Sequence, residues 1–193
     1  MSKKPYHHGD LRTAMIENSI KFINEHGAST LSLRKIAKAC GVSHSAPYSH
    51  FSCKDALLAA IETFIHDKFT TVLEDAVGEG EATPQGLVKL GCAYITFFLH
   101  DPQYFFFLFS RANSEYGEGY ENAPYDFFIS YISQVFEAMD YPQELWMKTA
   151  TAHWAMMHGL ASIAIAEDPH DEQVNMWEER TSAIMSKNHM IFG

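Results

Sequence analysis

The sequence predicts an all-α protein, and three observations lead to this fold class. Apolar residues recur at three- and four-residue spacing along most of the 193-residue chain, which is the period of an amphipathic helix. No segment alternates apolar and polar residues in the manner of a half-buried strand. Prolines and capping residues stand where helices would begin. We therefore expect an N-terminal three-helix domain that a long helix joins to a larger helical body.

The predicted N-terminal domain covers residues 1–55, and its first helix covers residues 11–25. Asp10 is the expected N-cap of this helix, and Gly27 is expected to end it. The apolar residues of the helix share one broad face. This face is expected to supply a large part of the domain's core.

Two shorter helices follow in the same domain. Ser32 is the expected N-cap of the second helix, which ends before Gly41 because glycine readily adopts the left-handed conformation. The third helix is expected at residues 44–50. Pro47 costs no hydrogen bond there if Ser45 is the cap, since the first four N–H groups of a helix have no partner within it. We expect a late or distorted start of this helix.

The helical body is expected to cover residues 56–193. The sequence Ser52-x-x-Asp55 is close to a capping box and begins the long connecting helix, which ends near Val77. Further helix starts are marked by proline at the first helical position, at Pro84, Pro102 and Pro142. The remaining predictions are a loop at residues 111–124 and two final helices at residues 143–166 and 171–187.

Charge is divided unevenly along the chain. Residues 1–55 contain eight Lys and Arg against four Asp and Glu, a net charge of +4. Residues 56–193 contain six basic and twenty acidic residues, a net charge of −14. A basic end on an acidic body is typical of proteins that bind a polyanion through the basic end. Chance segregation of solvated charges gives the same pattern, so the charge alone does not identify the partner.

Several functional classes are disfavoured by what the sequence lacks. No apolar run approaches the roughly 20 residues that cross a bilayer, and the N-terminus has no apolar signal-peptide section, so we expect a cytoplasmic protein without a membrane partner. The three cysteines form no C-x-x-C pair. Phosphate-loop, nucleophile-elbow and His-Glu-x-x-His motifs are missing. We expect no enzyme activity, no cofactor and no metal, with metal sensing by the eleven histidines as a minor alternative.

Residues 32–51 have the features of a helix-turn-helix. Such a motif needs two short helices, a tight turn that often contains glycine, and a second helix whose exposed side chains reach base edges in the major groove. Gly41, Val42 and Ser43 supply the turn. The third predicted helix carries small polar residues and little apolar face of its own, which favours a partner in a DNA groove.

The motifs of this segment resemble the DNA-binding signature of the TetR family. The matching residues are Gly27, Ser32-x-Arg34-x-Ile36-Ala37, Gly41-Val42-Ser43, Ala46-Pro47-Tyr48, His50-Phe51, Lys54 and Leu57-Leu58. They agree in type and spacing over about the first third of the chain. Pro47 departs from the aliphatic residue most common there in the family. The resemblance implies a helix-turn-helix domain joined to a C-terminal helical domain that binds an effector and dimerises.

The resemblance also implies which residues contact DNA. Tyr48, His50 and Lys54 are expected to contact phosphates, and Lys54 would do so from a helix N-terminus whose N–H groups also attract anions. The candidates for reading bases or fixing the register are Ser32, Arg34, Ser43, His44, Ser45 and Ser49.

A second resemblance lies in the segment from Trp154 to Gly159, which is similar to the Trp-x-x-x-His-Gly motif of one class of TetR-like C-terminal domain. Trp154 and His158 stand on one helical face, at i and i+4. The expected lining of an effector pocket for an apolar or aromatic compound is Phe97, Phe98, Phe105, Trp154, Met157 and His158. Core packing of the same residues is the alternative interpretation.

The sequence thus predicts a DNA-binding transcription regulator, namely a repressor that a small-molecule effector releases from a palindromic operator. A homodimer joined through the last two helices would place two recognition helices about one DNA turn apart. The alternative is a helical ligand-binding or adaptor protein without specific DNA binding. Arg34, Tyr48, His50 and Lys54 argue against this alternative, because they are the residue types that bind DNA.

Overall fold

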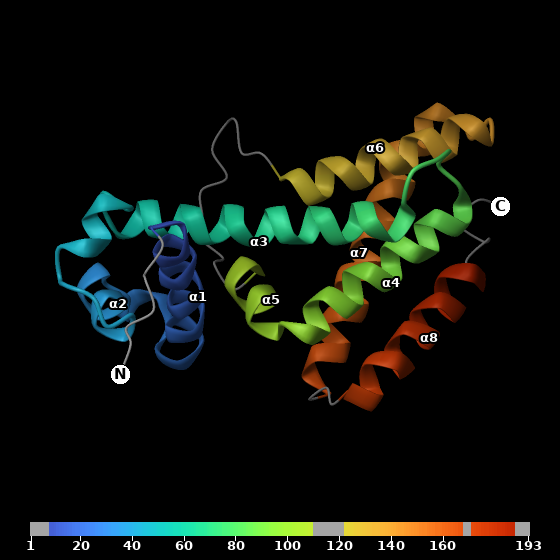
Figure 1. The fold of residues 1–193 in the computed structure, drawn as a ribbon. Coiled ribbons are helices and arrows are strands. Elements are labelled where there is room, and N and C mark those ends of the chain that lie inside the picture. Colours follow the sequence, from blue (N-terminus) through green and yellow to red (C-terminus); the bar gives the residue numbers. More distant parts are fainter. Residues whose placement is uncertain (1–7, 110–121, 168–170, 188–193) are drawn as a thin grey trace. The chain divides into compact units, whose positions relative to one another are not determined.

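The computed structural model describes residues 8–109, 122–167 and 171–187. Within these ranges every regular element is a helix and no strand occurs, which confirms the predicted all-α fold class (Figure 1). None of the described helices is long and apolar enough to span a membrane.

The helices have the following bounds, in chain order. The first five elements are α1 (His8–His26), the 3-10 helix η1 (Ala28–Thr30), α2 (Leu33–Ala39), the 3-10 helix η2 (Ala46–Ser49) and α3 (Lys54–Val77). The others are α4 (Pro84–His100), α5 (Pro102–Phe109), α6 (Ala123–Ala138), the 3-10 helix η3 (Gln143–Leu145), α7 (Trp146–Ala166) and α8 (Asp171–Lys187).

The chain divides into two compact units. The first unit comprises Met1–Ile65 and Gln103–Ser114, and the second comprises His66–Pro102 and Glu115–Gly193. Helix α3 runs through both units, since the division falls within it. The division of the sequence into domains at residue 55 remains a prediction.

The core of the first unit is formed by α1, α2 and the first half of α3. Each of these helices contributes aliphatic side chains that are at most 2% exposed: Met15, Ile16, Ile20, Ile36, Leu57, Ile61 and Ile65. Burial of each side chain of this kind is worth about 1.5–3 kcal/mol. The predicted apolar faces of the first two helices therefore form this core, together with the buried Ser19, whose hydroxyl donates to the Met15 carbonyl at 2.6 Å.

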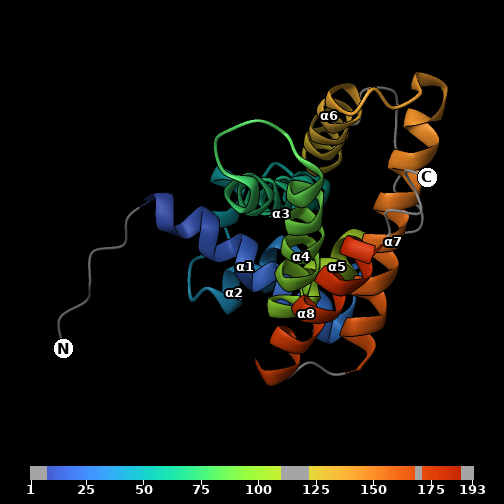
Figure 2. The same cartoon turned by 90° about the vertical axis from the view of Figure 1, so that its right-hand side faces the viewer.

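Helix α4 is the central helix of the second unit. Helices α7 and α8 both pack along it, and α8 lies beside it in both views (Figures 1 and 2). Two glycines of α4 allow this close packing, because a Cβ atom at Gly91 would overlap Met185 of α8 and a Cβ atom at Gly86 would overlap Tyr131 of α6. The Tyr131 hydroxyl also accepts a hydrogen bond from the backbone N–H of Thr83 at 3.2 Å.

Two predicted helix starts are wrong. Helix α1 begins at His8, so Asp10 lies inside the helix and is not its N-cap. Helix α3 begins at Lys54, which places Cys53 and not Ser52 at the N-cap position. The first backbone hydrogen bond of the helix shows this, because the Leu57 N–H donates to the Cys53 carbonyl at 3.2 Å.

Other boundaries differ by a few residues or in helix type. The predicted third helix at residues 44–50 is only the 3-10 turn η2, and the predicted helix at residues 143–166 begins with the separate 3-10 turn η3. Pro47 lies in the first turn of η2 and Pro142 is the N-cap of η3, positions at which the missing proline N–H costs no helical hydrogen bond. Of the predicted loop, residues 111–121 lie outside the described residues, and α6 already begins at Ala123.

Candidate nucleic-acid interface

Helix α2 is closed at both ends in the way that its sequence predicts. The Ser32 side chain accepts a hydrogen bond from the N–H of Lys35 at 3.4 Å and so caps the N-terminus. At the other end Val42 N–H donates to Ala37 O at 3.0 Å, and Gly41 N–H donates to Lys38 O at 3.1 Å. Gly41 has a φ of +66°, and this pattern is a Schellman motif. The turn of the predicted helix-turn-helix is therefore tightly defined.

The segment after this turn presents a row of exposed polar side chains. Ala46 N–H donates to Ser43 O at 3.0 Å, and the Ser43 and Ser45 hydroxyls are 3.1 Å apart. Pro47 is buried and anchors η2, and the backbone N–H of Phe51 donates to its carbonyl at 2.9 Å. Buried anchors on the inner side leave the intervening residues at the surface.

The predicted DNA-contacting residues of this segment share that surface. Ser43, His44, Ser45, Tyr48 and Ser49 are all exposed, and Tyr48 is 54% exposed despite its large ring. His50 is half-buried beside Phe51. Arg34 is exposed on the first turn of α2, close in sequence to the capping Ser32. The arrangement offers hydroxyls, imidazoles and a guanidinium to a partner, which are groups that bind phosphates and base edges.

The Lys54 ammonium lies at the start of α3 and donates to the backbone carbonyl of Ser29 at 3.1 Å. Lys35 of α2 donates to the carbonyl of Thr30 at 2.7 Å. Two lysines from two helices therefore bind neighbouring carbonyls of the η1 turn. The predicted phosphate-binding Lys54 has a second role within the unit, because it joins the start of α3 to η1.

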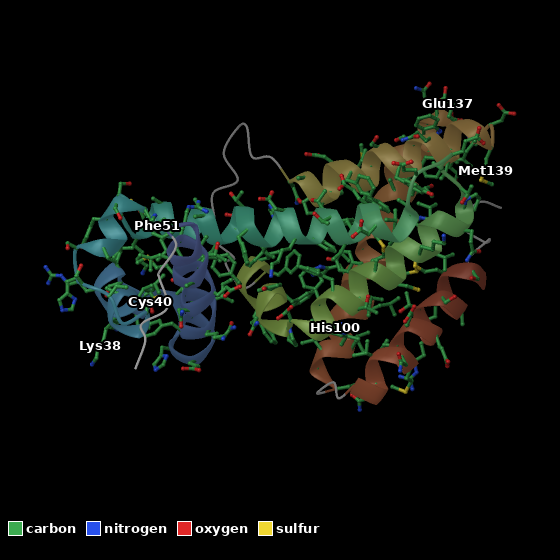
Figure 3. All side chains as sticks on the ribbon, in the orientation of Figure 1. Lys38, Cys40, Phe51, His100, Glu137 and Met139 are labelled. Atoms are coloured by element: carbon green, nitrogen blue, oxygen red, sulfur yellow. The ribbon has the colours of Figure 1, made fainter. Side chains whose placement is uncertain are left out.

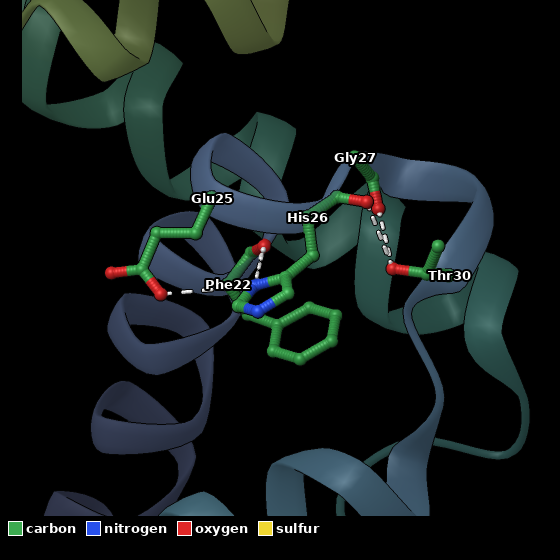
Figure 4. Close-up of polar contacts among 5 residues, drawn as sticks. All are labelled: Phe22, Glu25, His26, Gly27 and Thr30. Atoms are coloured by element: carbon green, nitrogen blue, oxygen red, sulfur yellow. Dashed lines mark hydrogen bonds and ion pairs between the residues drawn. The ribbon is translucent and has the colours of Figure 1, made fainter.

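The η1 turn is itself held by a compact set of polar contacts (Figure 4). The Thr30 hydroxyl lies 3.1 Å from both the His26 and the Gly27 carbonyl oxygens. The His26 ring stacks on Phe22, with ring centroids 4.5 Å apart, and its Nδ1 atom is 3.3 Å from the Phe22 carbonyl oxygen. These contacts fix the turn that the two lysines bind.

Three basic residues of this region were not among the predicted DNA contacts. Lys38 is exposed in the last turn of α2 and points away from the unit (Figure 3). Lys35 lies over the Phe22 ring at 5.2 Å, and the Arg12 guanidinium lies over the Phe51 ring at 5.6 Å. The sequence shows that these residues are basic. Where their side chains point depends on which face of each helix is buried, and the sequence does not show this.

Cys53 is exposed at the N-cap of α3. The backbone N–H of Ala56 and the hydroxyl of Ser52 lower the pKa of the Cys53 thiol. Burial instead raises the pKa of Cys40 and raises that of Cys92 to about 11. The chain thus has one thiol that ionises more readily than the other two.

The predicted effector-pocket residues fall into two groups. Phe105 belongs to α5 in the first unit, where its ring contacts Phe106 and Phe109. The others belong to the second unit and are Phe97, Phe98, Trp154, Met157 and His158.

In the second unit the aromatic residues meet around Tyr94, a residue that the predictions left out. Its ring lies 5.1 Å from Phe98 and 5.3 Å from Trp154, and its hydroxyl is hydrogen-bonded to Nδ1 of His158 at 3.1 Å. Phe69 of α3 stacks on Phe97 at 4.8 Å. Burial raises the pKa of Tyr94 and lowers the pKa of His158, which favours the neutral forms of both. Tyr94 carries a hydroxyl inside an otherwise apolar run of the sequence, and this feature could have marked it as a candidate site residue.

Comparison with known proteins identifies the region that contains the helix-turn-helix. Residues 16–61 match the model of the family described as bacterial regulatory proteins, tetR family. The chain carries a TetR-family N-terminal domain. The match covers the helix-turn-helix and ends before the second unit. A family of regulatory proteins agrees with the expectation that the chain is not an enzyme. The resemblance of residues 154–159 to the Trp-x-x-x-His-Gly class remains a prediction.

A curated relative supports the same assignment for the TetR-type domain. The chain is 37% identical over 60 residues to the uncharacterized HTH-type transcriptional regulator YuxN of Bacillus subtilis (strain 168). The aligned part is 31% of this chain and 21% of the relative, so the chain matches about a fifth of the relative's length.

Solved structures resemble the chain over nearly its full length. A Rhodococcus sp. RHA1 protein of unknown function has a TM-score of 0.69 and 27% identity, covering 94% of this chain and 98% of its own. A TetR family transcription regulator from Marinobacter aquaeolei VT8 has a TM-score of 0.68 and 20% identity, covering 90% and 94%. The fatty acid degradation regulator FadR from Bacillus halodurans has a TM-score of 0.71 and 14% identity, covering 96% of each. The TetR-type fold therefore extends beyond the N-terminal domain.

Proposed function

We propose that the protein is a transcriptional regulator of the TetR type, a homodimer that binds a palindromic DNA operator and releases it when a small-molecule effector binds. The observation that carries the proposal is the surface of residues 43–49, where Pro47 is buried and every predicted DNA-contacting side chain is exposed. A surface of hydroxyl, imidazole and phenol groups beside a tight turn fits the major groove of DNA.

Charge supports DNA as the partner of this surface. The net charge of +4 lies in residues 1–55, which contain the helix-turn-helix. Arg34 and Lys38 are exposed on α2, and Lys54 lies at the start of α3. Contacts from such residues to phosphates supply most of the sequence-independent affinity for DNA.

The dimer part of the proposal is supported by one face of α7. From Thr151 to Ala166 the exposed side of this helix has no charged residue. It presents small or apolar side chains, namely Thr151, Ala152, Ala155, Ser162, Ile163 and Ala166. Ile163 is 54% exposed, and Ile184 of α8 is 39% exposed. A second copy packed on this face would bury these groups and bring two recognition surfaces together.

The effector part of the proposal is supported by a groove in the second unit. It has a volume of about 660 Å³ between α3 and α4, where Phe97 and Val72 supply apolar lining and Asp67, Lys68 and Asp101 supply charged groups. This volume lies within the range of small-molecule sites. An effector that has an apolar or aromatic part and a polar or charged group fits such a lining. Movement of α3 on binding would reach the DNA-binding domain, because α3 begins directly after the helix-turn-helix.

The decisive experiment is selection of bound sequences from a pool of random DNA duplexes at physiological salt. Recovery of a palindromic sequence is the expected result. Absent or nonspecific binding would overturn the proposal in favour of a ligand-binding or adaptor protein. Light scattering on the same preparation measures the mass of the free and the DNA-bound protein, and a monomer on DNA would contradict the dimer.

A matched pair of variants assigns the binding to the proposed surface. Arg34→Ala removes an exposed cation from α2, and Lys148→Ala removes an exposed cation from α7 in the other unit. Arg34→Ala is expected to weaken operator binding about 5- to 150-fold through loss of a base contact, since a good bidentate contact is worth about 1–3 kcal/mol. Lys148→Ala is expected to leave the operator affinity unchanged.

A further inference from the structure

We propose that a cavity in the first unit is a binding site for a small, uncharged aromatic ligand. The cavity encloses about 610 Å³ between the end of α1 and the helix α5. Its lining consists of Ile23, Asn24, Gly27 and Ala28 on one side and Gln103, Phe106 and Phe107 on the other. All seven residues belong to the first compact unit. The volume is within the usual range for small-molecule sites.

Among the described residues, the lining of this cavity contains no ionisable side chain. An ionised ligand would find no ion partner in this lining. The two larger grooves of the second unit differ in this respect, because one is lined by Lys89 and Glu178 and the other by Asp67 and Lys68. The uncharged lining therefore selects neutral ligands for the cavity beside α5.

Two phenylalanines give the cavity an aromatic wall. Phe107 is 2% exposed and belongs to the interior, whereas Phe106 is 53% exposed. The Phe105 ring meets Phe106 edge-on, with centroids 6.3 Å apart and planes at 89°. An aromatic ring held in this way and left half exposed offers a surface on which a planar ligand can pack.

The polar groups of the cavity are two primary amides. Asn24 comes from α1 and Gln103 comes from α5. Each amide has a carbonyl acceptor and an NH₂ donor, so either can bind the donor and acceptor of a carboxamide. An aromatic ring that carries a carboxamide matches both features of the lining.

At Gly27 no side chain fills the cavity, and hydrogen bonds hold the backbone in place. A Cβ atom at this position would meet only the Ser29 hydroxyl, at 4.0 Å. The Gly27 N–H donates to Ile23 O at 2.7 Å, and its carbonyl accepts from the Thr30 hydroxyl at 3.1 Å (Figure 4). A ligand would not have to order this wall, and preorganisation of that kind favours affinity.

Benzamide is the probe for this site, with benzoate as its charged counterpart of the same shape. Titration of the full-length ¹⁵N-labelled protein is expected to shift the backbone amide signals of Gly27, Ala28 and Gln103 with a Kd on the order of 1 mM, as for a ligand of this size. Benzoate is expected to bind at least about tenfold more weakly, because the lining offers it no cation. No DNA is present, so the result is independent of the proposed regulatory function.

Variants of one helix test whether the aromatic wall is responsible. Phe106→Ala is expected to weaken benzamide at least about fivefold through loss of the ring contact. Phe109→Ala is the matched control, because Phe109 is 40% exposed on the same helix and does not line the cavity. Asn24→Asp adds a carboxylate at an exposed position and is also expected to weaken binding. The proposal is overturned by nonsaturable binding, by shifts confined to other residues, or by equal effects of Phe106→Ala and Phe109→Ala.

Discussion

The ammonium group of Lys54 and the carbonyl oxygen of Ser29 are 3.1 Å apart and hydrogen-bonded. The bond connects the first residue of α3 to the η1 turn, just before the capping Ser32 of α2. An ammonium group has three donors, so Lys54 can keep this bond while it donates to a phosphate. Its role in positioning the two helices and its predicted role in DNA binding are therefore compatible.

Lys54→Ala is expected to weaken binding to all DNA sequences by a similar factor. Loss of one phosphate contact should reduce the slope of log K against log salt concentration by about one unit. Fluorescence anisotropy at several salt concentrations measures this slope for operator and nonoperator duplexes. Lys54→Arg keeps the charge and should keep most of the slope. An unchanged slope for Lys54→Ala would show that Lys54 does not contact a phosphate.

Ser32 offers a way to separate stability from DNA binding. Ser32→Ala removes the cap on the Lys35 N–H and is expected to lower the free energy of unfolding by about 1 kcal/mol. Ser32→Asp keeps a capping oxygen and should restore stability, while its negative charge weakens DNA binding. Urea unfolding and anisotropy on the same samples test both effects. A stable Ser32→Asp protein with unchanged DNA affinity would place Ser32 outside the interface.

Gly41 is expected to be intolerant of substitution although it has space around it. A Cβ atom at this position would meet nothing within 4 Å, but the φ of +66° is unfavourable for L side chains. Gly41→Ala should therefore lower the free energy of unfolding by about 1 kcal/mol, and Gly41→Asn by less. Thermal unfolding of the two variants makes the comparison. Equal stability of Gly41→Ala and the parent protein would contradict the left-handed backbone conformation at this turn.

The sequence was most informative where a residue shapes the backbone of its immediate neighbours in the chain. Ser32, Gly41 and the end of α3 at Val77 were predicted correctly, because caps and left-handed glycines act through neighbouring residues. The start of α3 was predicted one residue too early. Cysteine is not among the usual N-cap residues, so the sequence favoured Ser52 over Cys53 as the N-cap of α3. The length of η2 was overestimated, since the structure has a four-residue 3-10 turn there with Pro47 buried in it.

The placement of the aromatic residues could not be derived from spacing. Phe98 and Phe105 lie seven residues apart, yet they belong to different compact units. The apolar period shows which face of a helix is buried but not against which helix. Lys54 illustrates the same limit for charged residues, since its contact with Ser29 joins positions 25 residues apart.

The buried His153 and the half-buried His158 of α7 predict how stability depends on pH. Burial lowers the pKa of His153 and of His158 in the folded protein below the usual value of 6.5. Between the lowered pKa and 6.5 the unfolded chain binds more protons than the folded one, so the free energy of unfolding falls as the pH falls through this interval. Urea unfolding above and below pH 6.5 measures the loss. The double variant His153→Gln, His158→Gln should flatten this dependence, and an equally steep loss in the variant would place its origin elsewhere.

The three thiols are expected to react with iodoacetamide in a definite order. Cys53 is exposed, and the Ala56 N–H lowers its pKa, whereas burial raises the pKa of Cys40 and brings that of Cys92 to about 11. Because the thiolate is the reactive form, Cys53 should be alkylated at least about tenfold faster than the others near neutral pH. Peptide mass spectrometry over time measures the three rates. Cys53→Ser should abolish the fast reaction and Cys92→Ser should leave it intact, and a fast reaction that survives Cys53→Ser would show that the cap of α3 does not activate this thiol.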